Sequence, residues 1–314
     1  MVWRWPGNRL RRANHRLRTV KDFLQSGGGA MHRLYLPPPP LAAFIRCFWY
    51  WDGAAHSPGA PAPGAPGPQL HTRERLLPNG EASMVFNLRD DEMRIYDADD
   101  SGRFVSCGLA GLTGARIHCV SIDAITEDRV VGIQFHPGGT FPFFGVPAHE
   151  VANQSVPLEY LWGRAAIEIR EQLLAAPSVE GMFALLERCL LAQLVRPLEL
   201  HPAIEFARSH ICRAPQIATV SGVTERIGLS HRRFIELFHD QIGLTPKAFC
   251  RVRRFQRVLQ RVHRKQAVDW ARVALEGGYY DQAHFIHDFQ GFSGLTPAAY
   301  LALATEHLNH VPMT

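Results

Sequence analysis

Two short groups of polar and basic side chains occupy equivalent positions in the second half of the chain. One is the His-Arg-Arg run at residues 231–233, and the other comprises Gln282, His284 and His287. Side chains of these types hydrogen-bond to base edges and phosphates, and they reach the major groove of DNA when they project from the first turns of a helix. Whether these side chains could bind DNA therefore depends on whether the surrounding sequence forms helices that present them.

Both groups belong to an internal repeat with an offset of 51 residues. The sequence "GLTPKAF" at 243–249 returns as "GLTPAAY" at 294–300, and a Phe-x-x-x-Phe motif precedes each copy, starting at Phe234 and Phe285. So many features at identical offsets are not expected by chance. A helical solenoid would need three or more copies, whereas this chain has two.

Each copy is predicted to fold as a helix, a short turn and a second helix. In the first copy Thr219 caps one helix, Gly228 permits the turn and Ser230 caps the next helix. In the second copy Gly277–Gly278 stands at the turn and Asp281 is the cap. Each "GLTP" supplies a glycine that ends one helix, a threonine that caps the next and a proline for its first turn. A packed helical hairpin is the alternative, but the polar residues that start each second helix favour DNA recognition.

A basic segment connects the two copies. Residues 246–265 hold eight Lys or Arg residues and no acid, with apolar residues at helical spacing. A helix from Lys247 to Val262 would be about 24 Å long. A charge run is often only a solvated helix face, but its place between two candidate DNA readers favours contacts with phosphates. The predicted phosphate-binding residues are Lys247, Arg251, Arg253 and Arg257.

The segment from about 201 to 304 resembles the DNA-binding domain of AraC/XylS-family transcriptional regulators. The stretch "ARVALEGGYYDQAHFIHDFQGFSGLTPAAY" follows the family pattern, with Tyr279 in place of a phenylalanine, and Arg254 matches an arginine of the connecting helix. The resemblance implies two helix-turn-helix units joined by one long helix, with double-stranded DNA as the partner. Departures lie at Glu236, where the family often has a basic residue, and at His287, which replaces a usual arginine.

This resemblance, together with the helix starts, predicts a set of DNA-binding residues. The set is Ser230, His231, Arg232, Arg233, Ile235, Glu236, Asp281, Gln282, Ala283, His284 and His287. The residues expected to face the groove are Arg232, Ile235 and Glu236 in the first unit and Gln282, Ala283 and His287 in the second.

The N-terminal part is predicted to be an antiparallel β barrel or sandwich followed by helices, which makes the whole chain α+β. Runs of β-branched and aromatic residues, bounded by turn-forming residues, start at Phe44, Ala82, Arg94, Ile117 and Val130. The stretches "LLPNGEASMVFNL" and "GIQFHPGGTFPFFGVPAHEV" resemble, more loosely, a cupin-like domain found ahead of the DNA-binding module in many such regulators.

Charge divides the chain in the same way. Residues 1–30, 31–200 and 201–314 carry net charges of +6, −6 and +5, so a basic module that meets a polyanion is joined to an acidic module with another role. The first thirty residues are either a poorly ordered extension, a start assigned ahead of Met31, or a basic arm that contacts phosphates. The expected organisation is an extension at 1–30, a cupin-like domain at 31–155 with a Pro/Gly/Ala-rich loop at 53–69, a helical hairpin at 156–200, the DNA-binding domain at 201–304 and a tail at 305–314.

No catalytic constellation is evident. His118, His136 and His149 stand alone, without the H-x-H pair of metal-binding cupins, and the six cysteines include no C-x-x-C pair. We therefore expect neither enzyme activity nor a metal or cofactor. The barrel could also hold a small molecule. The candidate lining residues, for which a core role is the favoured alternative, are Trp49, Trp51, Phe135 and His136.

These patterns favour a sequence-specific transcriptional regulator whose N-terminal domain senses a small molecule, forms a homodimer, or does both, with RNA polymerase as a further partner. The alternative is a barrel enzyme or DNA-repair module delivered by the same reader. Ada-type DNA methyl-transfer proteins carry this reader, but they require a zinc-holding cysteine cluster that is absent here. No apolar run approaches the roughly 18 residues that cross a bilayer, so we expect a cytoplasmic protein without a membrane partner.

Overall fold

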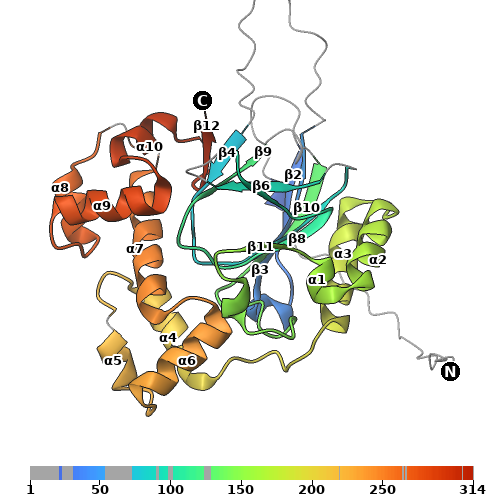
Figure 1. Cartoon of the computed structure of the whole chain (residues 1–314), viewed down its shortest axis with the longest axis horizontal. Coiled ribbons are helices and arrows are strands. Elements are labelled where there is room, and N and C mark those ends of the chain that lie inside the picture. The colour runs from blue at the N-terminus through green and yellow to red at the C-terminus, as the bar shows by residue number, and fades with distance from the viewer. Residues whose placement is uncertain are drawn as a thin grey trace, which may run out of the picture.

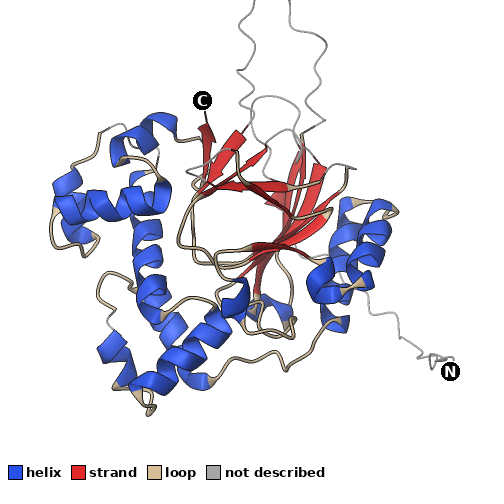
Figure 2. Cartoon of the chain, in the orientation of Figure 1, coloured by secondary structure: helices blue, strands red, loops and turns tan. Residues whose placement is uncertain are grey.

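The structure, a computed structural model, describes residues 21–22, 31–53, 73–89, 92–97, 102–123, 129–218, 220–263, 265, 267–305 and 307–313. The predicted cap Thr219, most of the N-terminal extension and nearly all of the Pro/Gly/Ala-rich loop lie outside the described residues. A β-rich N-terminal part precedes a helical C-terminal part (Figure 2), which confirms the α+β prediction. None of the described helices combines the length and apolar character needed to span a bilayer.

Two antiparallel sheets form the N-terminal part and curve around a common interior (Figure 1). The larger sheet has the order β1-β2-β3-β10-β5-β8-β11, and the smaller has the order β12-β4-β9-β6-β7. The strands of the larger sheet are β1 (Lys21–Asp22), β2 (Met31–Tyr35), β3 (Ile45–Asp52), β5 (Ser83–Asn87), β8 (Ala110–Thr113), β10 (Arg129–Phe135) and β11 (Ser155–Pro157). Those of the smaller sheet are β4 (Arg73–Leu76), β6 (Arg94–Asp97), β7 (Phe104–Ser106), β9 (Val120–Asp123) and β12 (His310–Met313). Two short 3-10 helices are η1 (Leu41–Ala43) and η3 (Ala148–Val151).

Alternation along β3 determines which face of the larger sheet the helices cover. Phe48 and Tyr50 are buried, and the Phe48 ring lies 6.3 Å from that of Phe183 in α3 (Val179–Ala192). Trp49 and Trp51 lie on the opposite face of the strand, because successive side chains of a strand point to opposite sides. The first core therefore lies between the sheet and the helices that follow it.

The helical hairpin predicted at 156–200 contains a break near its start. Gly163 adopts a positive φ of 57° and separates α1 (Glu159–Trp162) from α2 (Arg164–Leu174). Glycine takes this backbone conformation without the steric penalty of a side chain. The next helix, α3, is capped by Ser178, whose hydroxyl accepts a hydrogen bond from the Gly181 N–H.

The C-terminal part contains a long central helix with a helix-turn-helix unit at each end. In Figure 1, α7 runs along the flank of the barrel between the group that contains α5 and α6 and the group that contains α8, α9 and α10. The helices are α4 (Pro202–Arg213), α5 (Val220–Thr224), α6 (His231–Ile242), α7 (Pro246–Val262), α8 (Trp270–Glu276), α9 (Gln282–Ser293) and α10 (Pro297–Leu303).

The repeated "GLTP" phrases perform the predicted structural role. Gly243 and Gly294 end α6 and α9 in the left-handed conformation, with φ of 91° and 66°. Thr245 caps α7 and Thr296 caps α10, and each side chain accepts from the backbone N–H three residues later. The two copies therefore fix the direction of the chain after each second helix.

The C-terminal end returns to the N-terminal part. Strand β12 pairs with β4 in antiparallel register, so that Val311 lies opposite Arg75 and is 1% exposed. The helical core also includes Leu77 and Cys119 from the β-rich part. Residues 305–314, expected as a tail, therefore contribute a strand to the smaller sheet.

Candidate nucleic-acid interface

The first predicted reading helix, α6, is anchored on one face and polar on the other. Phe234 and Phe238 are fully buried, whereas residues 231–233 are exposed. Ser230 caps the helix and accepts a hydrogen bond of 3.3 Å from the Arg233 N–H. Burial of two phenylalanines fixes the rotation of α6, so its basic N-terminal turn projects away from the core.

Glu236 is paired within the same helix. Its carboxylate accepts from Arg232 Nε at 2.9 Å and lies 3.7 Å from an Arg233 guanidinium nitrogen. The hydrogen bond from Arg232 lowers the pKa of Glu236 below its ordinary value. In this arrangement Glu236 orients the two arginines. To accept a hydrogen bond from a cytosine amino group, the Glu236 carboxylate would have to give up its contacts with Arg232 and Arg233.

The second predicted reading helix, α9, is likewise buried on one face and polar on the other, but it carries fewer cationic side chains. Asp281 caps it by accepting a 2.7 Å hydrogen bond from the His284 N–H. Phe285 and Phe289 are fully buried and hold the helix on the core. The predicted DNA-binding residues of this unit that are exposed are Asp281, Gln282, Ala283, His284 and His287.

The four predicted phosphate-binding residues of α7 lie in different surroundings. Lys247 and Arg257 are exposed. Arg251 is also exposed, but its guanidinium is 2.6 Å from the carboxylate of the buried Asp288 in α9. The guanidinium of Arg253 faces the N-terminal part, where it lies 3.2 Å from Glu81 and donates to the Asn79 carbonyl oxygen.

Arg253 therefore does not belong with the surface cations. Its side chain is 16% exposed and neutralises Glu81, so it is not available to a phosphate in this arrangement. The prediction from charge alone was wrong here because α7 has two packed faces, one toward the helical units and one toward the β-rich part. Arg254, the residue matched to the family's connecting helix, lies over the Tyr279 ring at 5.4 Å and packs the second unit onto α7.

The contact between the two parts is a buried ionic cluster. Glu81 pairs with Arg46 of β3 and Arg253 of α7, and the Gln134 side chain donates to its second carboxylate oxygen. Burial raises the pKa of Glu81, while the two guanidinium groups act in the opposite direction. Sequence reasoning missed Arg46 and Glu81, because no motif marks a residue that pairs with another domain.

The proposed lining residues of a ligand cavity do not gather in one place. Phe135 is fully buried and packs on Phe143 with ring centroids 6.1 Å apart, in agreement with the core alternative. Trp49 covers Gly132 so closely that a Cβ there would lie 2.3 Å from the indole. Trp51 instead meets the ring of His32 edge-on at 6.1 Å.

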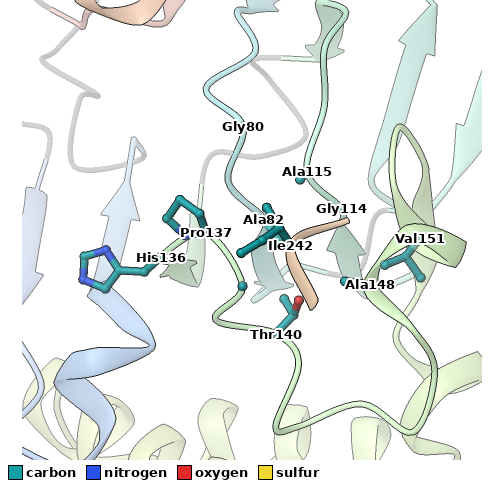
Figure 3. A pocket seen from close by; sticks show the side chains of 11 residues that line it. Gly80, Ala82, Gly114, Ala115, His136, Pro137, Thr140, Ala148, Val151 and Ile242 are labelled. Atoms are coloured by element: carbon teal, nitrogen blue, oxygen red, sulfur yellow. The ribbon is translucent and has the colours of Figure 1, made fainter. Parts of the chain in front are cut away.

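His136 lines a different, very small cavity at the junction of the two parts. Figure 3 shows Ile242, from the end of α6, beside Ala82, with the His136 ring directed away from them. The cavity measures about 10 Å³, which is room for about one water molecule. Burial lowers the pKa of His136 to about 4, and Arg46 acts in the same direction. His136 is therefore uncharged at neutral pH and does not offer a cation to a ligand.

Comparisons with known proteins agree with this division. Residues 223–302 match a family model described as a helix-turn-helix domain, and residues 33–157 match one described as a domain of unknown function, DUF6597. No curated protein matches the chain.

Two solved structures illustrate the structural likeness. The C-terminal domain of AraT, a response regulator from Geobacillus stearothermophilus, is 18% identical, over 35% of this chain and 91% of that chain, with a TM-score of 0.32. ToxT from Vibrio cholerae is 9% identical, over 74% of this chain and 97% of that chain, with a TM-score of 0.40.

The helix-turn-helix match includes α6 and α9, so the family comparison and the geometry locate the candidate DNA-binding domain in the same residues. This helix-turn-helix domain is preceded by the DUF6597 domain at residues 33–157.

Proposed function

We propose that α6 and α9 read two stretches of DNA in a sequence-specific manner and that the N-terminal domain controls this binding through its contact with α7. The observation that carries the proposal is that both helices are anchored by buried phenylalanines and present capped, polar N-terminal turns to solvent. Direct readout of the major groove uses such turns. The arginine-rich turn of α6 and the Gln282-containing turn of α9 differ, so each half of the site would have its own sequence.

The test begins with genome-wide footprinting of the intact protein, which supplies the DNA site. Binding to that site is then measured for Arg232→Ala and Gln282→Ala. If each residue contacts a base, each variant should lose about 1–3 kcal/mol of binding free energy, or roughly 5- to 150-fold in Kd. Arg164→Ala is a matched control, because Arg164 of α2 is 87% exposed and lies outside the helix-turn-helix units.

Unchanged binding by both the Arg232 and the Gln282 variants would overturn the assignment of the reading helices. Equal weakening by Arg164→Ala would instead show that the loss reflects charge alone. Loss of discrimination at one part of the site, with the rest of the footprint retained, is the expected result.

The control exerted by the N-terminal domain has two forms within this proposal, the binding of a small molecule and self-association. The ionic cluster around Glu81 supports such control because it joins β3 directly to α7. A rise in unfolding temperature in the presence of metabolite pools would indicate binding of a small molecule. The molar mass from size-exclusion chromatography with light scattering would show whether the protein self-associates. Contact with RNA polymerase belongs to the same proposal and is tested by transcription from the footprinted site.

The alternative function is a barrel enzyme or DNA-repair module that uses the same DNA reader. No group of three or more His, Cys, Asp or Glu side chains in the described ranges is arranged to hold a metal ion. Metal analysis of the purified chain still separates the two classes, since stoichiometric zinc or iron would favour the enzyme.

A further inference from the structure

The two helix-turn-helix units differ in the spacing between the positive-φ glycine of the turn and the cap of the second helix. In the first unit Gly228, with φ of 65°, is followed by Leu229 and then by the cap Ser230. In the second unit two residues separate Gly278, with φ of 75°, from the cap Asp281. The spacing from the glycine to the cap is therefore longer by one residue in the second unit, although each turn leads into a twelve-residue helix.

Tyr279 takes the inward place that Leu229 fills in the first unit. Leu229 packs against the helical core. Tyr279 is 4% exposed and meets the Phe285 ring at 5.3 Å between centroids. The additional residue is Tyr280, which is 91% exposed.

This exposure departs from the usual role of the position. The residue before a helix cap commonly packs against the fourth residue of the helix as a hydrophobic staple. In α9 the neighbouring Tyr279 provides that packing on Phe285, so Tyr280 is free to project. A single exposed aromatic residue means little by itself; Tyr160 of α1 is 81% exposed in the N-terminal part. What distinguishes Tyr280 is its place beside the reading turn that contains Gln282.

We propose that Tyr280 is a DNA contact, with its hydroxyl donating a hydrogen bond to a backbone phosphate at the edge of the groove read by α9 and its ring lying over the adjoining sugar. The inference rests on the proposed function of α9. Tyrosine hydroxyls are among the groups that bind DNA phosphates and fix the register of a protein on the duplex. A tyrosine also offers a rigid, amphipathic contact surface.

The composition of α9 supports this role. At the positions where α6 carries Arg232 and Arg233, α9 carries Ala283 and His284. The second unit thus has fewer fixed cations at its first turn, and a neutral donor from the turn supplies a phosphate contact there. A neutral donor displaces no counterion, so it should strengthen binding without a steeper dependence on salt.

The experiment uses the full chain and the footprinted duplex, with Kd measured at several salt concentrations. Tyr280→Phe removes only the hydroxyl, and Tyr280→Ala removes the ring as well. We expect about a fivefold loss for Tyr280→Phe and about tenfold or more for Tyr280→Ala, with the salt slope unchanged. The loss should be similar on an unrelated duplex of equal length, because a phosphate contact carries no base information.

Tyr160→Ala is the matched control and should bind as the wild type does. Wild-type binding by Tyr280→Ala, alongside weakened binding by Arg232→Ala, would overturn the inference and leave the proposed function intact. A loss confined to the specific duplex would also overturn it, since it would indicate a base contact. Failure of the wild type to bind any footprinted site would remove the proposed function and this inference together.

Discussion

At the scale of single residues, α7 is held by two buried carboxylates. Among the described residues, Glu81 and Asp288 are the buried acidic side chains, and each pairs with an arginine of α7. Removing one member of a buried ion pair leaves an uncompensated charge, which is more costly than losing an exposed pair. Arg251 and Arg253 therefore help to hold α7 in place, whereas Arg257 is exposed and donates to the Arg213 carbonyl oxygen without an ion pair to either carboxylate.

Arg253→Met and Arg257→Met test this division on neighbouring turns of one helix. Arg253→Met should destabilise the protein by about 2 kcal/mol, because Glu81 keeps Arg46 but loses its second cation. It should leave the salt slope of DNA binding unchanged. Arg257→Met should alter stability by less than about 0.5 kcal/mol and, if Arg257 meets a phosphate, lower the salt slope by about one.

Urea unfolding measures the first effect and salt-dependent binding the second. A reduced salt slope for Arg253→Met at wild-type stability would contradict the assignment of Arg253 to the domain contact and would restore it to the phosphate-binding set.

Whether the role of a single residue could be predicted from the sequence depends on how close in the chain its bonding partner lies. The caps Ser230 and Asp281 were predictable because each side chain bonds a backbone N–H three residues later. The role of Arg253 was not, because its partner Glu81 is 172 residues away. The sequence shows that Arg253 is cationic, but it does not show which face of α7 the N-terminal part will cover.

At the scale of elements, two glycines near the ends of α6 and α9 should respond in opposite ways to replacement by alanine. Gly243 ends α6 with φ of 91°, and a Cβ there would lie 3.0 Å from the carbonyl oxygen of Ala148 in η3. Gly291 lies within α9, is exposed and has no atom within 4 Å of an added Cβ. Gly243 is therefore required by the turn and the domain contact, whereas Gly291 only weakens its helix.

Gly243→Ala should destabilise the protein by about 1–2 kcal/mol, since an L side chain in this conformation is strained. Gly291→Ala should stabilise it by about 0.5–1 kcal/mol through helix propensity. Thermal unfolding of both variants is the measurement. A stabilising Gly243→Ala would show that α6 can end without the left-handed residue, and a destabilising Gly291→Ala would show a close neighbour at that face.

Helix limits were predictable where apolar spacing and caps agree. The predicted helix from Lys247 to Val262 is observed as Pro246–Val262. The break at Gly163 was not predicted, because apolar spacing continues across it. The short strands β4, β7 and β11 lack a long β-branched run and are defined by their pairing; local sequence carries little of that information.

At the scale of the whole molecule, the two parts are joined by contacts between residues far apart in the chain. The buried Gln256 of α7 donates to the Pro78 carbonyl oxygen and to the Asn309 side chain, both at 2.8 Å. Leu77 donates its backbone N–H to the Asn309 carbonyl oxygen. Neither composition nor periodicity predicted this arrangement, because the tail becomes a strand only when β4 is beside it.

Val311→Asp tests whether β12 holds the two parts together. Val311 is 1% exposed, so a carboxylate at this position would be buried in a site built for an apolar side chain. Release of the strand should lower the stability of the fold by about 2–4 kcal/mol and separate one cooperative unfolding transition into two. Pro312→Ala is the matched control, because Pro312 faces the other side of the strand and is only partly buried.

Calorimetry and limited proteolysis together distinguish the outcomes. Detachment of β12 exposes residues 307–309 and the edge of β4, so proteases should cut Val311→Asp in this region and leave Pro312→Ala intact. Since Gln256 would lose its Asn309 partner as well, α7 would become less firmly fixed to the barrel, and control of the reading helices by the N-terminal domain should weaken. A single transition at the wild-type temperature in Val311→Asp would show that the ionic cluster at Glu81 suffices to join the two parts and that the strand contributes only locally.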